Sequence, residues 1–163
     1  MIRMVGAMVD AREPAQQLVD MLESRLAEAR KRAERLPQRP RVFFEEWDDP
    51  LISWIGWVSE LVEIAGDIDI SGDRAKQAAA KDRVVTIDEV IAREPDLIIG
   101  SWCGKKFRPE RVTARPGFAQ TPAVQHRDIY EIKSSLILQP GPAALTDGLA
   151  RLQEIIQGWA SRR

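Results

Sequence analysis

Two predicted strands of this 163-residue chain each lead into a tryptophan. The first strand, Arg41–Glu46, is followed by Trp47, and the second, Asp96–Gly100, is followed by Ser101 and Trp102. Ligands of open parallel sheets bind outside the carboxyl ends of the strands. Because an indole carries about 150–250 Å² of surface, each tryptophan either caps the hydrophobic core or contributes to an aromatic recognition surface. Two tryptophans at equivalent positions favour the recognition surface.

The residues around Trp102 also allow a different chemistry, that of a reactive thiol. Cys103 is the only cysteine of the chain, and Lys105 and Lys106 are cations that favour a thiolate. A nucleophilic thiol also needs a base, and the only histidine, His126, stands on a predicted loop with no third group to orient it. We therefore predict no catalytic residues and no enzyme, and keep a small thiol enzyme using Cys103 as an alternative.

Sequence patterns for metal and phosphate sites are missing from the chain. There is no CxxC, HExxH or EF-hand loop. The segment Gly100–Gly104 carries bulky residues where a phosphate would need the backbone to approach closely. The sequence therefore predicts no metal site and no cofactor.

The charge balance argues against a nucleic-acid partner. Lysine and arginine number 24 against 25 acidic residues, a net charge of −1. The most basic stretch, Arg25–Arg41, is interleaved with Glu28 and Glu34, which is typical of a solvated helix face. We predict that the chain binds no nucleic acid.

Strand and helix patterns alternate along the second part of the chain. The predicted strands are 41–46, 96–100, 123–125 and 128–132, and the predicted helices are 53–65, 87–93, 109–114 and 144–159. Residues 66–83 are predicted to form a loop with one helical turn. Thr86 and Glu89 form a capping box that opens the helix at residue 87. Such alternation predicts an α/β fold, a single three-layer α/β/α lobe with a mostly parallel sheet.

A long amphipathic helix is predicted before this lobe, from Pro14 to Leu36. Leu18, Leu22 and Leu26 lie on one apolar stripe of it, because they recur at helical spacing. Such a stripe packs either on the sheet of its own lobe or on a partner, and the sequence leaves both open.

Four runs of the sequence resemble the C-terminal lobe of the cobalamin/siderophore class of periplasmic substrate-binding proteins of ABC transporters. They are Arg41–Ser53, Trp57–Gly66, Thr86–Ile99 and Ile137–Gly148. The segment Gly100–Phe107 is similar to a corrinoid-binding branch of that class. The class has two α/β lobes joined by one long helix, holds its ligand between the lobes and delivers the ligand to a membrane permease.

The resemblance implies a division of the chain at residue 39. Residues 1–39 would be the tail of a preceding lobe plus the connecting helix, and residues 40–163 the C-terminal ligand-binding lobe. The first lobe and the export signal of the class are not found in the sequence, so we expect a truncated chain, with a separate N-terminal lobe as a further partner. By resemblance the chain is periplasmic; with a genuine start at Met1 it would be cytoplasmic.

The resemblance also implies a binding surface on this lobe. Its residues are Trp47, Asp48, Asp49, Ile52, Trp102, Cys103, Lys105 and Asp128. The implied ligand is a cobalamin or another corrinoid, because a broad apolar face edged with amides suits an aromatic surface with a few polar groups. Lys105, Lys106 and Arg108 instead favour an anionic iron–siderophore, which stays an alternative. Asp82 stands where related cobalamin-binding proteins have a tryptophan.

The carboxylates of Asp88 and Glu89 stand in the first turn of the predicted helix at 87. Acidic residues there complement the helix dipole. The resemblance implies a further role, docking on arginines of the ABC permease of the inner membrane. A remaining alternative is a non-binding interaction module that pairs through the exposed face of the long helix.

Overall fold

One five-stranded sheet forms the centre of the computed structural model, which describes residues 1–163. Its strands are β1 (Arg41–Asp48), β2 (Leu51–Ser53), β3 (Ile68–Asp69), β4 (Leu97–Gly100) and β5 (Ile129–Glu131). The order across the sheet is β2–β1–β4–β5, and β3 pairs with the first residues of β1. β1 runs parallel to β3 and β4, and β4 runs parallel to β5. Only β2 is antiparallel, because a tight turn at Asp49 and Pro50 returns the chain beside β1.

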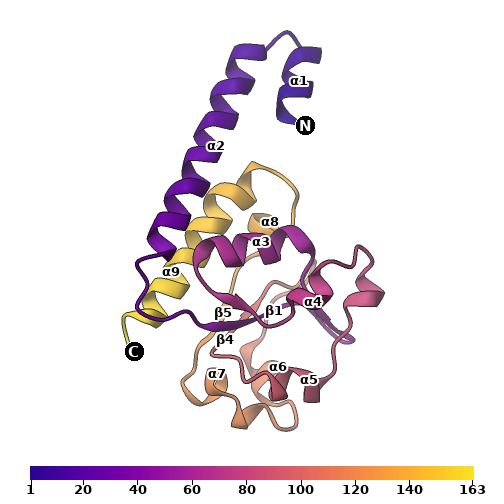
Figure 1. Cartoon of the computed structure of the whole chain (residues 1–163). Helices are drawn as coiled ribbons and strands as arrows, with labels where there is room; N and C mark the ends of the chain where they lie inside the picture. Colours follow the sequence, from indigo (N-terminus) through magenta and orange to yellow (C-terminus); the bar gives the residue numbers. More distant parts are fainter.

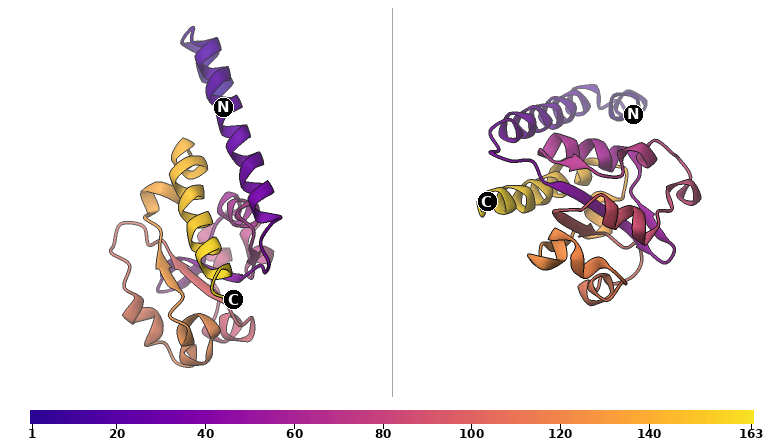
Figure 2. Two further views of the ribbon diagram at one scale, coloured as in Figure 1. Left: turned by 90° about the vertical axis from the view of Figure 1, so that its left-hand side faces the viewer. Right: turned by 60° about the horizontal axis from the view of Figure 1, so that its bottom comes forward.

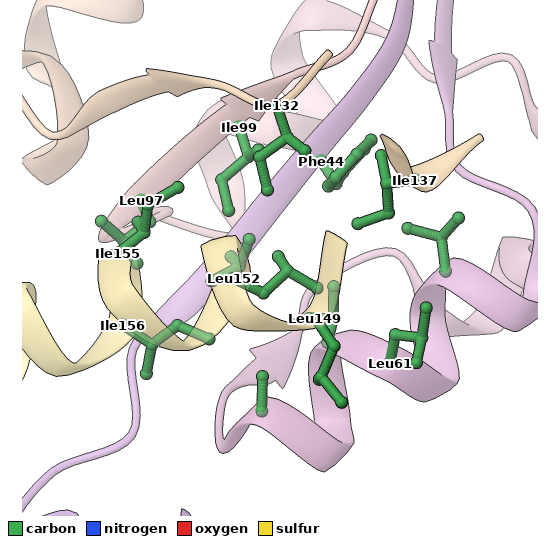
Figure 3. Close-up of a cluster of buried hydrophobic side chains, with 14 of the residues drawn as sticks. Phe44, Leu61, Leu97, Ile99, Ile132, Ile137, Leu149, Leu152, Ile155 and Ile156 are labelled. Atoms are coloured by element: carbon green, nitrogen blue, oxygen red, sulfur yellow. The ribbon is translucent and has the colours of Figure 1, made fainter. Parts of the chain in front are cut away.

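Three helices lie on one side of the sheet, two of them against the strands and the first packed mainly on the second (Figure 1). They are α2 (Arg12–Ala33), α3 (Gly56–Ala65) and α9 (Leu149–Ala160), the last preceded by a π-helical turn at Ala144–Gly148. A cluster of 20 buried hydrophobic residues lies between these helices and the strands. Figure 3 shows the part of this cluster to which α9 contributes Leu152 and Ile155 and the sheet contributes Phe44 and Leu97.

Short helices cover the opposite face of the sheet. They are α5 (Ile87–Ala92), α6 (Pro109–Thr113) and α7 (Pro122–Gln125), with a 3-10 turn at Phe118–Gln120. Phe43 and Ile98 point to this face, because successive side chains of a strand alternate between faces. Together with Trp102 and Phe107 they belong to a second cluster of 10 buried residues. The predicted three-layer α/β/α lobe is thereby confirmed.

Helix α1 (Ile2–Met8) folds back along α2 to form a hairpin. The two helices pack closely, since a Cβ atom on Gly6 would lie 2.3 Å from the Cβ atom of Ala15. The hairpin extends well beyond the sheet (Figures 1 and 2). The C-terminal half of α2 packs on its own lobe, through buried Ala29 and partly buried Leu26. For that half of the helix, the apolar stripe therefore packs on its own lobe and not on a partner.

Several predicted elements differ from the observed ones. Residues 123–125 do not form a strand: they belong to α7, because Pro122 occupies the first helical turn, where its missing N–H costs nothing. The helix predicted at 53–65 begins only at Gly56, after the short strand β2. The loop at 66–83 contains β3, the short helix α4 (Gly72–Ala75) and a 3-10 turn at Ala80–Arg83, and a short helix α8 (Ser134–Ile137) follows β5. No helix combines the length and the apolar character that crossing a membrane requires.

Candidate functional site

Both strand-end tryptophans lie at the same edge of the sheet. The ammonium nitrogen of Lys105 lies 3.9 Å from the ring centroid of Trp47 and 4.9 Å from that of Trp102, so the two rings share one cation. Their environments differ, because Trp102 is 3% exposed and Trp47 is only half-buried. Trp102 packs edge-on against Phe107, with ring centroids 4.9 Å apart. Of the two indoles, therefore, Trp47 is the one that exposes part of its ring.

The indole of Trp102 is fixed by a buried ion pair. Its Nε1–H donates to Glu45 Oε1 across 2.8 Å, and the side chain of Glu45 is fully buried. Arg115 donates to both carboxylate oxygens of Glu45, across 2.6 and 2.7 Å. Two parallel hydrogen bonds of this kind hold a carboxylate in one orientation. Glu45 therefore ties the loop after β4 to the middle of β1.

A second carboxylate, Asp48, lies at the end of β1 and is held by two cations. Lys105 donates to its Oδ1, and Nη1 of Arg111 lies 2.9 Å from its Oδ2. The side chain of Asp48 is 2% exposed. Burial raises the pKa of Asp48, but the hydrogen bond and charge of Lys105 and the charge of Arg111 outweigh that effect, and the pKa lies below its ordinary value. Asp48 is therefore an anion throughout the neutral range.

The β1–β2 hairpin contributes the remaining residues of the site, together with the loop after β4. The indole N–H of Trp47 donates to the carbonyl oxygen of Asp49 across 2.9 Å, and Asp49 itself is exposed. Ile52 of β2 pairs with Trp47 across the hairpin, at a point where the register of β1 shifts. Cys103 is exposed on the neighbouring loop. Seven of the eight predicted binding residues thus come from the β1–β2 hairpin and the segment after β4, at one edge of the sheet.

Asp128, the eighth predicted residue, does not join this group. It immediately precedes β5 and therefore lies at the amino end of that strand, opposite the edge that carries Trp47. Its carboxylate is buried, accepts a hydrogen bond from the Tyr130 hydroxyl across 2.9 Å, and pairs with Arg162 near the end of α9. The structure therefore gives Asp128 a role in anchoring the last helix and separates it from the predicted binding surface.

The two acidic residues of α5 differ in their partners. The Glu89 carboxylate accepts a hydrogen bond from the Thr86 backbone N–H across 2.7 Å, as the predicted capping box requires, and also pairs with Arg74. The backbone hydrogen bond of Thr86 and the charge of Arg74 lower the pKa of Glu89. Asp88 is exposed and forms no ion pair or side-chain hydrogen bond. Of the pair, Asp88 is the free carboxylate.

The residues of a thiol enzyme are not brought together. Cys103 follows β4 at the carboxyl edge of the sheet, whereas His126 ends α7 and precedes β5 at the amino edge. The structure contains no cluster of three histidine, cysteine, aspartate or glutamate side chains that could hold a metal ion.

Sequence reasoning missed three charged residues of the site, Glu45, Arg111 and Arg115. The only signal was that Glu45 directly follows the apolar run Val42–Phe44 of the predicted strand, because an acid in a buried strand needs a cation partner. Which arginine supplies it could not be read from a chain in which Glu45 and Arg115 are 70 residues apart.

Comparison with known proteins gives one family match and a large set of similar folds. The family model described as "Periplasmic binding protein" matches residues 1–136. The uncharacterized ABC transporter substrate-binding lipoprotein YvrC of Bacillus subtilis (strain 168) is 29% identical over 160 residues, which are 95% of this chain and 48% of that protein. The chain thus spans about half the length of the curated relative that it matches.

Three solved structures illustrate the similarity of fold. A possible iron-binding (periplasmic solute-binding) protein of Staphylococcus epidermidis ATCC 12228 has a TM-score of 0.80 and 21% identity, covering 95% of this chain and 59% of that one. The heme-binding protein RhuT of Roseiflexus sp. RS-1 has a TM-score of 0.74 and 24% identity, covering 96% and 62%. The vitamin B12-binding protein BtuF of Vibrio cholerae has a TM-score of 0.69 and 19% identity, covering 93% and 56%.

The solved structures establish the fold alone, whereas the family match extends over all five strands of the sheet and over the loops that form the site at its edge. On that match, the chain belongs to the periplasmic binding protein family, whose members bind solutes and are not enzymes.

Proposed function

We propose that the chain is a solute-binding lobe of an ABC importer, with its binding surface at the carboxyl edge of the sheet. The observation that carries this proposal is the half-buried Trp47 ring, positioned next to a network of two buried carboxylates and three cations. Such a surface combines an apolar plane with a few fixed polar groups, which is the composition of small-molecule sites. In this proposal residues 1–39 connect to a second lobe and residues 40–163 carry the binding surface.

The proposed ligand is a cobalamin or another corrinoid. A corrinoid presents a wide apolar face and peripheral amides, which would contact the Trp47 ring and the donors of Lys105 and Lys106 respectively. The fold similarity to the vitamin B12-binding protein of Vibrio cholerae is compatible with this ligand.

An anionic iron chelate is the second candidate, and the charges of the site favour it. Lys105 and Arg111 share the single carboxylate of Asp48, which leaves one positive charge in excess. Lys106 and Arg108 are exposed on the same loop and form no ion pair. Solved structures of similar fold include an iron-hydroxamate transport protein of Saccharomonospora viridis DSM 43017 and the heme-binding RhuT.

Binding is tested by calorimetric titration of the purified chain with cyanocobalamin, dicyanocobinamide, ferrichrome and hemin. We expect one of these to bind, and Trp47→Ala to weaken that binding about tenfold or more, as loss of a stacking aromatic ring does. Trp57→Ala is the matched control, because Trp57 lies on α3, away from the site, and also donates its indole N–H to a backbone oxygen. Absence of binding by all four probes, or equal effects of the two substitutions, would contradict the proposed site.

Docking on the permease is proposed for Asp88 alone. An exposed carboxylate with no intramolecular partner can meet an arginine of another protein, whereas Glu89 is already committed to Thr86 and Arg74. The test is ligand-stimulated ATPase activity of the importer in proteoliposomes. We expect Asp88→Asn to reduce the stimulation and Asp147→Asn, at another exposed aspartate, to leave it unchanged.

A further inference from the structure

The Trp47 ring is covered by a cation in this structure. The Lys105 ammonium group lies 3.9 Å from its centroid, close enough for a cation–π contact. A flat ligand that stacks on the same face of Trp47 must therefore displace Lys105. The cost of that displacement depends on what Lys105 leaves behind.

When Lys105 moves, it removes the hydrogen bond that it donates to the Asp48 carboxylate, but it does not leave that carboxylate without a cation. Its ion-pair partner Asp48 keeps a second cation, Arg111, whose Nη1 lies 2.9 Å from Oδ2. The contrast within the same site is Glu45, which has Arg115 as its only cation. Removing Arg115 would leave a buried charge alone, whereas removing Lys105 would not.

The backbone around Lys105 also leaves room for it to move. Gly104 has φ +75°, and no heavy atom lies within 4 Å of the position that a Cβ atom on it would occupy. Cys103, Gly104 and Lys106 are exposed, and Lys105 itself is 30% exposed. A lysine combines a single compact charge with a flexible four-carbon stem, so it can turn away without a change in the fold.

We propose that Lys105 is a specificity-determining cap on Trp47. In the free lobe it covers the indole. On binding it turns outward and donates an N–H to an oxygen acceptor at the rim of the ligand, so that the site favours flat ligands with such acceptors over flat ligands without them. This inference rests on the proposed binding function, and it adds the residue that selects among ligands.

The cap itself is tested without any ligand, by acrylamide quenching of tryptophan fluorescence. The fluorescence of Trp47 is the difference between the emission of a given protein and the emission of the same protein carrying Trp47→Phe. We expect Lys105→Met to raise the quenching constant of Trp47 about twofold, because the indole loses the group that covers it. Lys106→Met, which changes the exposed neighbouring residue, should leave the quenching constant of Trp47 unchanged. Equal quenching of Trp47 in the wild type and in Lys105→Met overturns the cap.

Selectivity is tested with two flat probes of the same core, a tetrakis(sulfonatophenyl)porphyrin and a tetrakis(N-methylpyridinium)porphyrin. We expect the wild type to prefer the sulfonated probe, and Lys105→Met to weaken its binding about tenfold, as loss of one charge-assisted hydrogen bond does. Lys106→Met should weaken it less than Lys105→Met. An equal loss in the two variants would show general charge attraction in place of a specific contact and would overturn the selective role.

The two tests separate the inference from the proposed function. If neither porphyrin nor any of the four metal-chelate probes binds, the binding function fails, while the quenching of Trp47 still reports whether Lys105 covers it. If a probe binds but Lys105→Met changes neither quenching nor selectivity, the binding function stands and the role of Lys105 is wrong.

Discussion

The indole N–H of Trp102 donates to Glu45 Oε1 across 2.8 Å, and this bond joins the loop after β4 to the interior of β1. The same carboxylate receives two hydrogen bonds from Arg115, in the segment after α6. Three segments of the chain are therefore held by one buried anion. This anion positions the loop that carries Lys105 and with it the candidate binding surface.

Removal of the Glu45 carboxylate should destabilise the lobe strongly. Glu45→Ala leaves the guanidinium of Arg115 without its partner and the Trp102 indole without its acceptor, and loss of one member of a buried pair costs about 3–5 kcal/mol. Glu45→Gln keeps an acceptor for Trp102 and should cost less. The measurement is the free energy of unfolding from urea titration followed by circular dichroism.

An exposed ion pair provides the control for this substitution. Arg41 and Glu94 lie 3.1 Å apart, and the side chain of Glu94 is 67% exposed. Because exposed pairs contribute about 0–1 kcal/mol, Glu94→Ala should change the free energy of unfolding by no more than that. A loss in Glu45→Ala as small as in Glu94→Ala would mean that the buried network does not hold the site together.

A second prediction concerns the fit of the β4 loop on the sheet. A Cβ atom on Gly100 would lie 1.8 Å from a ring carbon of Phe107, whereas one on Gly141 would meet nothing within 4 Å. Gly100→Ala must therefore push Phe107 out of the second core cluster, and overpacking of this kind costs about 1–3 kcal/mol. Gly141→Ala should leave the free energy of unfolding nearly unchanged. Equal stability of the two variants, measured by thermal unfolding, would contradict the close packing described here.

The sequence was sufficient for the layers of the fold. Apolar stripes at helical spacing and the aliphatic run of Leu97–Gly100 indicate elements that need cover on one or both faces, and those elements were found close to their predicted bounds. The capping box of Thr86 and Glu89 was also found as predicted, because all of its contacts are local.

The sequence was not sufficient for contacts between residues that are far apart in the chain. The resemblance assigns Asp128 to the binding surface, although it is the first residue of a predicted strand in a predicted parallel sheet, which places it at the amino end, opposite Trp47. The burial of Trp102 depends on Glu45, which is 57 residues away in the chain. Ion pairs of this separation leave no spacing pattern, so a single sequence can indicate that a buried acid needs a partner without identifying which cation it is.

A third prediction separates the two roles proposed for the start of α5. Thr86→Ala removes the side-chain acceptor of the Glu89 backbone N–H, a bond of 3.1 Å, and loss of an N-cap side chain costs about 1 kcal/mol. Asp88→Asn touches no intramolecular partner and should leave the free energy of unfolding within about 0.5 kcal/mol of the wild type. Urea titration of both variants gives the comparison. A destabilised Asp88→Asn would mean that Asp88 serves the fold and would weaken its assignment to docking.

A fourth prediction concerns the stability of the lobe at different pH values. Burial raises the pKa of Asp69 from 3.8 to about 6, against hydrogen bonds from Ser59 and from the backbone N–H of Ser71. Asp67 is fully buried beside it, and burial together with the charge of Asp69 raises the pKa of Asp67 as well. Between pH 4 and pH 6 the folded lobe therefore keeps a proton on Asp69 that the unfolded chain has already lost.

The sign of the effect follows from this difference in protonation. Below about pH 4 both states are protonated and the Asp69 contribution is fully present; as pH rises toward the folded pKa the unfolded state is favoured, by up to about 3 kcal/mol for a shift of about two pKa units. Asp69→Asn removes this titration, so the stability of the wild type relative to that variant should fall as pH rises from 4 to 7. The hydrogen bonds that Asp69→Asn loses change the free energy of unfolding by an amount that does not vary with pH. Asp147→Asn, at an exposed position, serves as the control. A difference between wild type and Asp69→Asn that stays constant over this range would mean that Asp69 is ionised in the folded lobe as readily as in the unfolded chain.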